Sequence, residues 1–126
     1  MKKIIFVLFL VFNSCNYDNC SERIGLELSY HLFTGINVDG KTYCDLINES
    51  FDGNEKSIVQ LSLVDVYDGA TYEHGEVLIE LIHNMSERKY TRLIEKLSLS
   101  DQKEIYYYLL AGLDFTNNSN FKRQKV

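Results

Sequence analysis

Apolar side chains recur at helical spacing along most of the chain. In residues 86–97, Tyr90, Leu93, Ile94 and Leu97 stand at i, i+3, i+4 and i+7, directly after Ser86, a residue type that caps helix N-termini. The preceding segment, 76–85, carries a similar stripe: Val77, Leu78, Leu81, Ile82 and Met85. The two patterns predict consecutive amphipathic helices with a short connection, which favours antiparallel packing.

Further helices are expected on both sides of this pair. A C-terminal helix starts at Ser98 or Ser100 and presents Ile105, Tyr108, Leu109 and Leu113. A helix from about Glu55 to Val66 follows the cap residue Asn54, and the Asp52-Gly53 dipeptide before it ends another helix. Ser21 caps a first helix that extends to about Phe33. The chain has no proline to interrupt any of them.

Residues 35–43, GINVDGKTY, break the helical pattern. They place β-forming residues around an Asp39-Gly40 turn, so both a small hairpin and an ordered loop fit, and we favour the loop. The predicted fold class is therefore all-α: a compact bundle or short stack of about five helices, with a small hairpin or loop near 35–43.

The N-terminus has a different character. Lys2 and Lys3 precede a run of apolar residues from Ile4 to Phe12, which is followed by polar residues and Cys15. A membrane-spanning helix needs about 20 apolar residues, so the run is too short to span. A charged start, a short apolar run and a small residue are typical of a secretory signal peptide.

The segment VFNSC, residues 11–15, resembles the lipobox of bacterial lipoproteins. That resemblance implies a lipid on the Cys15 thiol and cleavage that makes Cys15 the new N-terminus. The match departs from the usual pattern at Phe12 and Asn13, and it implies nothing about the fold. We expect a signal peptide at 1–14, a tether at 15–21, a single helical domain at 22–115 and a flexible tail at 116–126. Lipid anchoring would place the protein in the bacterial cell envelope; plain secretion is the alternative.

Cys20 and Cys44 remain as an even pair in a compartment that permits disulfides. A bond between them would close a loop of about 25 residues and contribute about 3 kcal/mol. Two unpaired thiols are the alternative, because the sequence does not show whether the two Cα atoms are close enough.

Charge is distributed unevenly. The chain has a net charge of −5, and the segment from Asp39 to Glu80 holds ten acidic residues against Lys41 and Lys56. Such a segment disfavours nucleic acid and favours a basic protein partner.

Tyrosine is abundant, with nine copies. Three of them, Tyr106-Tyr107-Tyr108, span about 200° of a helix, so at least one ring must reach a surface. Tyrosine is enriched at interfaces, and we expect a partner-binding face that combines acidic and tyrosine side chains: Asp65, Tyr67, Asp68, Tyr72 and Glu73.

The sequence contains no P-loop, Gly-x-Ser-x-Gly elbow or dinucleotide fingerprint. We therefore expect neither catalysis nor a cofactor. The leading hypothesis is an envelope lipoprotein that binds another protein, for example an immunity protein against a secreted toxin. One alternative is a structural or accessory lipoprotein of an envelope assembly. Another is a small metal-dependent hydrolase that uses His74, Glu76, Glu80 and His83.

Overall fold

The structure is a computed structural model that describes residues 19–29, 32 and 34–124, with side chains described up to Thr116. Within these residues it contains six helices and one two-stranded antiparallel sheet. The predicted all-α fold is confirmed.

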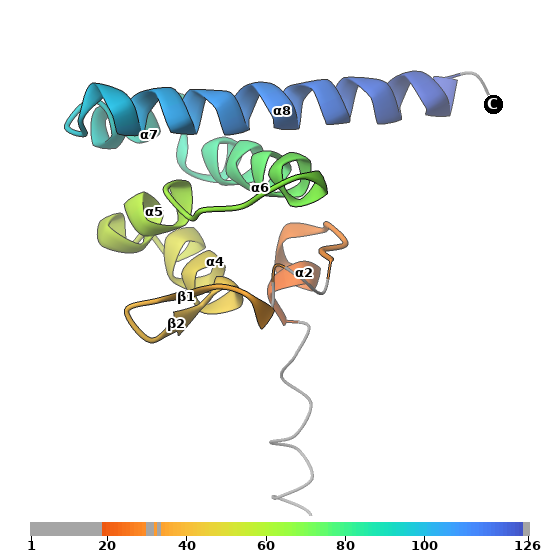
Figure 1. Cartoon of the computed structure of the whole chain (residues 1–126). Coiled ribbons are helices and arrows are strands. Elements are labelled where there is room, and N and C mark those ends of the chain that lie inside the picture. Colours follow the sequence, from red (N-terminus) through yellow and green to blue (C-terminus); the bar gives the residue numbers. More distant parts are fainter. Residues whose placement is uncertain (1–18, 30–31, 33, 125–126) are drawn as a thin grey trace, which may run out of the picture.

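The elements are stacked in layers (Figure 1). The long helix α8 lies along one side, α6 packs beneath it, α4 and α5 follow, and the β-hairpin and α2 lie on the opposite side. In chain order the elements are α2 (Asn19–Ile24), β1 (Asn37–Val38), β2 (Lys41–Thr42), α4 (Tyr43–Phe51), α5 (Glu55–Ser62), α6 (Gly69–Met85), α7 (Glu87–Ile94) and α8 (Leu99–Gln124).

Polar side chains fix the starts of several helices. Thr42 and Asp45 form a capping box before α4: Thr42 Oγ1 accepts from the Asp45 amide at 3.1 Å, and Asp45 Oδ2 accepts from the Thr42 amide at 2.9 Å. The Asn54 side chain accepts from the Ser57 amide at 3.0 Å at the start of α5. Ser86 caps α7 as predicted, and its φ of 101° turns the chain sharply between α6 and α7.

The predicted first helix, from Ser21 to Phe33, is wrong. Helix α2 ends at Ile24 because Gly25 adopts a φ of +69°, which glycine tolerates, and the amides of Gly25 and Leu26 both donate to the Ser21 carbonyl. The predicted tether is also too long, since Cys20 lies in α2 and is fully buried. The rest of the tether, 15–18, and the signal peptide, 1–14, lie outside the described residues.

A hairpin replaces the expected loop at 35–43. Asn37 pairs with Thr42 and Val38 pairs with Lys41. Both central residues of the turn have positive φ, 51° for Asp39 and 80° for Gly40, the geometry that matches the twist of a two-residue hairpin. The Asn37 side chain stabilises the turn by accepting from the Gly40 amide at 2.9 Å.

Two other boundaries differ from the prediction. Helix α5 ends at Ser62 rather than Val66, and residues 64–67 run without regular structure to α6. The Val66 amide in this connection donates to Tyr108 Oη of α8 at 3.5 Å. At the other end, α8 continues to Gln124, so most of the segment 116–126 has helical backbone.

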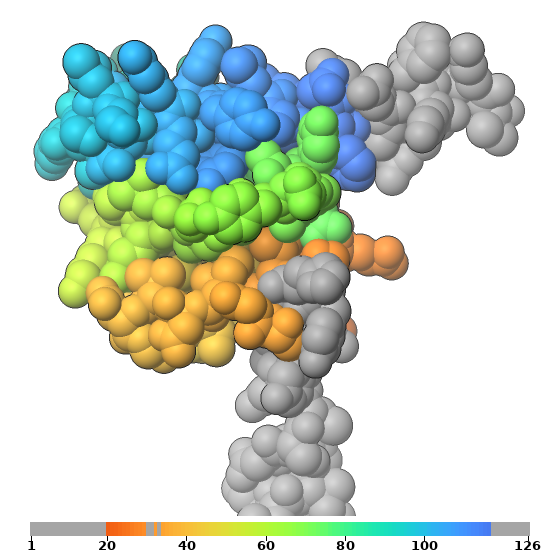
Figure 2. Space-filling view, in the orientation of Figure 1, coloured from red at the N-terminus to blue at the C-terminus, as the bar shows by residue number. Residues whose placement is uncertain are grey.

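Side chains from every helix contribute to one core. Its largest fully buried members include Tyr43, Leu46 and Ile47 of α4, Leu61 of α5, and Leu78 and Leu81 of α6. In the space-filling view α8 forms the upper layer of the domain, and the α5–α6 connection lies directly beneath it (Figure 2).

Candidate binding surface

A buried histidine stands at the centre of the molecule. His74 of α6 is fully buried, with its Nδ1 2.8 Å from Tyr43 Oη and its ring edge-on to Tyr108 at a centroid distance of 4.9 Å. Burial lowers the pKa of His74 to about 4, against an opposing interaction with the Ser62 backbone. Burial also raises the pKa of Tyr43 and brings that of Tyr108 to about 12. All three groups are therefore neutral at pH 7 and hold α4, α6 and α8 together.

The four residues of the metal-hydrolase alternative have separate surroundings. His74 is in the core, the Glu76 carboxylate accepts from Thr116 Oγ1 at 3.3 Å, Glu80 is half-buried, and His83 is exposed. Among the residues that the structure describes, no group of three or more His, Cys, Asp or Glu side chains could hold a metal ion.

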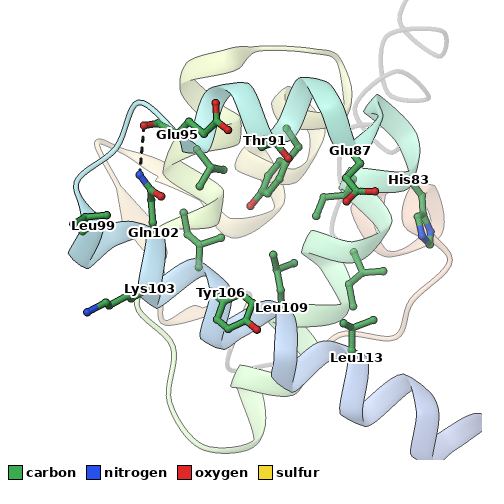
Figure 3. Close-up of a pocket in the computed structure, with 15 residues that line it drawn as sticks. His83, Glu87, Thr91, Glu95, Leu99, Gln102, Lys103, Tyr106, Leu109 and Leu113 are labelled. Carbon is green, nitrogen blue, oxygen red and sulfur yellow. Dashed lines mark hydrogen bonds between the residues drawn. The ribbon is translucent and has the colours of Figure 1, made fainter.

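A groove with a volume of about 770 Å³ lies between α6, α7 and α8 (Figure 3). Its lining is mostly apolar and includes Ile79, Ile82, Tyr90, Ile94, Ile105 and Leu109. Tyr90 is held in place by Ser62, whose Oγ is 2.8 Å from Tyr90 Oη. Gln102 joins α8 to the end of α7 by donating to the Leu97 carbonyl at 2.9 Å and the Glu95 carbonyl at 3.4 Å.

Charged side chains border the groove. Glu87 and Glu95 stand on the α7 wall, and Lys103 stands on the α8 wall (Figure 3). All three are exposed. The acidic wall is two helical turns long, because eight residues separate its carboxylates.

The exposed large apolar side chains of the described residues gather on or beside α8. Six of the eight belong to α8 itself: Leu99, Tyr106, Tyr107, Leu110, Leu113 and Phe115. The other two, Tyr67 and Tyr72, precede or begin α6, and the Tyr72 ring lies 6.0 Å from that of Phe115. Tyr106 and Tyr107 are each 63% exposed, whereas Tyr108 is buried, as the tyrosine triplet led us to expect.

The predicted partner face lies on the other side of α8 from the groove. Tyr106 lines the groove, and Tyr108, about 200° further round the helix, contacts the connection that carries Asp65 and Tyr67. Tyr67 is 72% exposed, and its hydroxyl donates to Asp65 Oδ2 at 2.7 Å, which raises the pKa of Tyr67. Asp68 is also exposed, immediately before α6.

Glu73 has a different environment from the other four residues of that face. Its side chain is half-buried, and its carboxylate accepts from the Ser29 amide at 3.0 Å. This contact ties the segment after α2 to α6.

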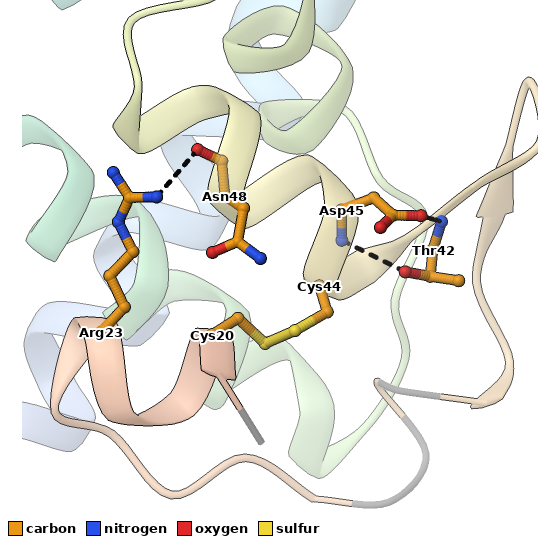
Figure 4. The surroundings of a disulfide bond; sticks show 6 residues. All are labelled: Cys20, Arg23, Thr42, Cys44, Asp45 and Asn48. Atoms are coloured by element: carbon orange, nitrogen blue, oxygen red, sulfur yellow. Dashed lines mark hydrogen bonds between the residues drawn. A yellow bond between two sulfur atoms is a disulfide. The ribbon is translucent and has the colours of Figure 1, made fainter. Parts of the chain in front are cut away.

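The expected bond between Cys20 and Cys44 is present (Figure 4). It joins α2 to α4, with a Cα–Cα distance of 5.5 Å. Arg23 reinforces the same junction through an ion pair with Asp52 and a hydrogen bond to the Asn48 carbonyl at 3.3 Å. Cys15, the expected lipidation site, lies outside the described residues.

Comparisons with known proteins give no match: no family fits the sequence, and no curated protein or solved structure is significantly similar. None of the described helices is both long enough and apolar enough to cross a membrane.

The groove was missed by reasoning from sequence. One signal for it was available: Leu99, Tyr106 and Leu113 recur at intervals of seven residues, which places them on one stripe of α8. Whether such a stripe faces a core or solvent depends on which helices lie beside it, and this is a tertiary property.

Proposed function

We propose that the chain is a non-catalytic, lipid-anchored protein of the bacterial envelope whose helical domain binds a basic protein partner along α8. The observation that carries the proposal is the concentration of exposed apolar side chains on and beside this one helix. Soluble proteins seldom leave so much apolar surface together unless another molecule covers it. Exposed tyrosines are well suited to binding a protein partner, because they bury a large area at a small entropic cost.

The charges around α8 favour a basic partner. Asp65 and Asp68 lie on one side of the helix, and Glu87 and Glu95 lie across the groove on the other. Lys103 is the one lysine or arginine among the described side chains that line the groove. A partner with an apolar segment flanked by lysine or arginine would match both features, and its association would be accelerated by electrostatic steering.

The position of α2 fits an anchored protein. Helix α2 lies on the side of the domain opposite α8 (Figure 1), and Cys15 precedes its first residue by only four positions. A lipid at Cys15 would therefore attach on the α2 side and leave α8 directed away from the membrane. The Cys20–Cys44 disulfide also suits an oxidising compartment outside the cytoplasm.

The anchor and the partner are tested separately. Cells that express the protein are grown with labelled palmitate, and a Cys15→Ala variant serves as control; label on the wild type alone supports the anchor. Label on neither protein contradicts it, and plain secretion then becomes the better explanation.

For the partner, the full-length protein is used to capture proteins from solubilised native membranes and from secreted fractions. We compare the wild type with Tyr106→Ser/Leu110→Ser and with Asp65→Lys/Asp68→Lys, and use Glu22→Lys/Glu27→Lys as a charge-matched control remote from α8. A stoichiometric basic partner that the wild type and the control retain and the Tyr106/Leu110 variant loses supports the proposal. A partner that all the variants retain equally contradicts the α8 surface.

The identity of a captured partner then distinguishes the two binding hypotheses. A secreted toxin would make the chain an immunity protein, and a resident envelope protein would make it an accessory component of an assembly.

A further inference from the structure

A second concave site lies on the other side of α7 from the groove. It has a volume of about 400 Å³ and is formed by the end of α4, the start of α5, the end of α6 and one face of α7. We call it the α7 notch and define it by six of its lining residues: Ser50, Phe51, Met85, Lys89, Arg92 and Lys96. Its volume falls in the range of small-molecule sites.

Three cations share the α7 side of the notch. Lys89 and Arg92 stand about one turn apart on α7, and Lys96 lies in the turn that follows the helix, which ends at Ile94. Among the described residues no carboxylate lies within ion-pair distance of any of the three; Glu55 also lines the notch and, like the three cations, is exposed. In a chain with a net charge of −5, such a cluster is unexpected.

Ser50 adds a second, independent feature. This residue of α4 is only 1% exposed, and its Oγ has no hydrogen-bond partner among the described residues. Leaving a buried hydroxyl unsatisfied is unfavourable. Ser50 lines the notch, so an oxygen atom of a ligand could accept from this hydroxyl once a small movement of the side chains over it exposes the oxygen.

Much of the remaining wall is apolar. Phe51, Ile58, Met85 and Leu93 line it, so the notch offers apolar surface next to the three positive charges. Inorganic anions would leave this wall uncovered, whereas an organic anion with an apolar group would use both parts of the site. Arg92 can bind a carboxylate through two parallel hydrogen bonds, a geometry that lysine lacks.

We propose that the α7 notch binds a carboxylate that carries an apolar group, with Arg92, Lys89 and Lys96 around the carboxylate, the Ser50 hydroxyl donating to it, and the apolar group against Phe51 and Met85. Two sources have this chemistry: a free aryl or alkyl acid, and the free C-terminus of a peptide that ends in an apolar residue. The site is separate from the α8 surface, and its proposal stands without the protein-binding function.

The test is equilibrium dialysis of the purified full-length protein in non-ionic detergent, with empty micelles as the blank. The probes are radiolabelled 4-phenylbutyrate and a short peptide ending in phenylalanine with a free carboxylate. The neutral amide of each probe controls for the charge, and acetate controls for the apolar group. Saturable binding of either acid, with at least tenfold weaker binding of its amide, is expected, because a charge-assisted hydrogen bond is worth about a factor of ten.

Variants locate the binding. Arg92→Gln/Lys96→Gln should weaken binding of the acids about tenfold or more. The matched control, Arg88→Gln/Lys56→Gln, removes two positive charges that line neither the notch nor the groove and should bind as the wild type does. Ser50→Ala should bind the acids more weakly without lowering the unfolding midpoint of the ligand-free protein, since the hydroxyl it removes has no partner there.

Tighter binding of 4-phenylbutyrate than of the peptide identifies a free acid as the source, and the reverse order identifies a peptide C-terminus. Absence of saturable binding by both acids overturns the proposal. Equal affinity for acid and amide also overturns it, as does an affinity that Arg92→Gln/Lys96→Gln leaves within twofold of the wild type.

Discussion

Gly75 of α6 and Gly112 of α8 meet backbone to backbone. A Cβ atom added to Gly75 would lie 2.6 Å from the amide nitrogen of Gly112, and one added to Gly112 would lie 2.6 Å from the Gly75 carbonyl oxygen. Only glycine lets the two helices approach so closely, and this crossing positions α8 over His74.

Replacing Gly75 with alanine should therefore destabilise the fold. The gain in helix propensity is about 1 kcal/mol, but backbone atoms on the facing helix have no low-cost way to move aside, so we expect a net loss of about 2 kcal/mol or more. Chemical denaturation measures this loss. Gly69→Ala is the matched control in the same helix: no atom lies within 4 Å of its added Cβ, so it should be neutral or stabilising. Equal changes in the free energy of unfolding for the two substitutions would contradict the close contact of α6 and α8 at Gly75.

Stability should fall in mild acid because of His74. The folded protein keeps this imidazole neutral down to about pH 4, whereas the unfolded chain takes up a proton below its ordinary pKa of 6.5. The unfolded state therefore binds more protons between these values, and the stabilisation that is present above pH 6.5 is lost as the pH falls towards 4. Between pH 7 and pH 5 the loss should be about 2 kcal/mol.

The variant His74→Gln isolates this effect, because its side chain stays neutral and the carboxylates are common to both proteins. Urea unfolding at pH 7, 6 and 5 should show a steeper decline for the wild type than for the variant. If the free energy of unfolding declined equally in the two proteins, His74 would be protonated as readily in the folded state as in the unfolded state.

The disulfide should contribute substantially to stability, because it connects positions 24 residues apart. In the chain-entropy description a loop of this length is worth about 3 kcal/mol. The double variant Cys20→Ala/Cys44→Ala and the reduced wild type should both unfold at lower urea concentration than the oxidised wild type. An oxidised protein no more stable than the reduced one would show that the disulfide does not stabilise the fold.

Truncation of Tyr106 and of Tyr108, two residues apart on α8, should change the free energy of unfolding by very different amounts. Tyr108→Ala removes a ring that is 3% exposed and packs on His74, and we expect a loss of about 3 kcal/mol. Tyr106→Ala removes a ring that is 63% exposed, and the free energy of unfolding should change by less than about 0.5 kcal/mol. Comparable losses at both positions would indicate that the groove is closed over Tyr106 in solution.

Predictions that depend on neighbouring residues were the most successful. Caps at Asn54 and Ser86 act on amides three residues ahead, so the sequence alone locates them. The prediction of the first helix also failed for a local reason. Gly25 is a recognisable helix stop, but the apolar spacing of Ile24, Leu28 and Leu32 suggested that the helix continued through it. The Asp39-Gly40 dipeptide is a typical hairpin turn, but we favoured an ordered loop at 35–43, and the structure has the hairpin.

Features that depend on distant packing were not predictable. Nothing near His74 in the sequence indicates that Tyr43 and Tyr108 will enclose it. Glu73 looked like one more acidic residue of an exposed face, yet its carboxylate is used by the Ser29 amide. The α7 notch likewise combines residues of α4, α5, α6 and α7 that lie far apart in the sequence.

The position of the disulfide limits how far the domain could extend from a lipid anchor at Cys15. Cys20 is fixed to the body of the domain, and four peptide units separate Asn19 at the start of α2 from Cys15, which span at most about 14 Å. With Cys15 lipidated as proposed, the domain would be confined to a thin layer directly above the lipid headgroups. Its encounters would then be a two-dimensional search along the membrane, and a partner would have to come down to that layer to be bound.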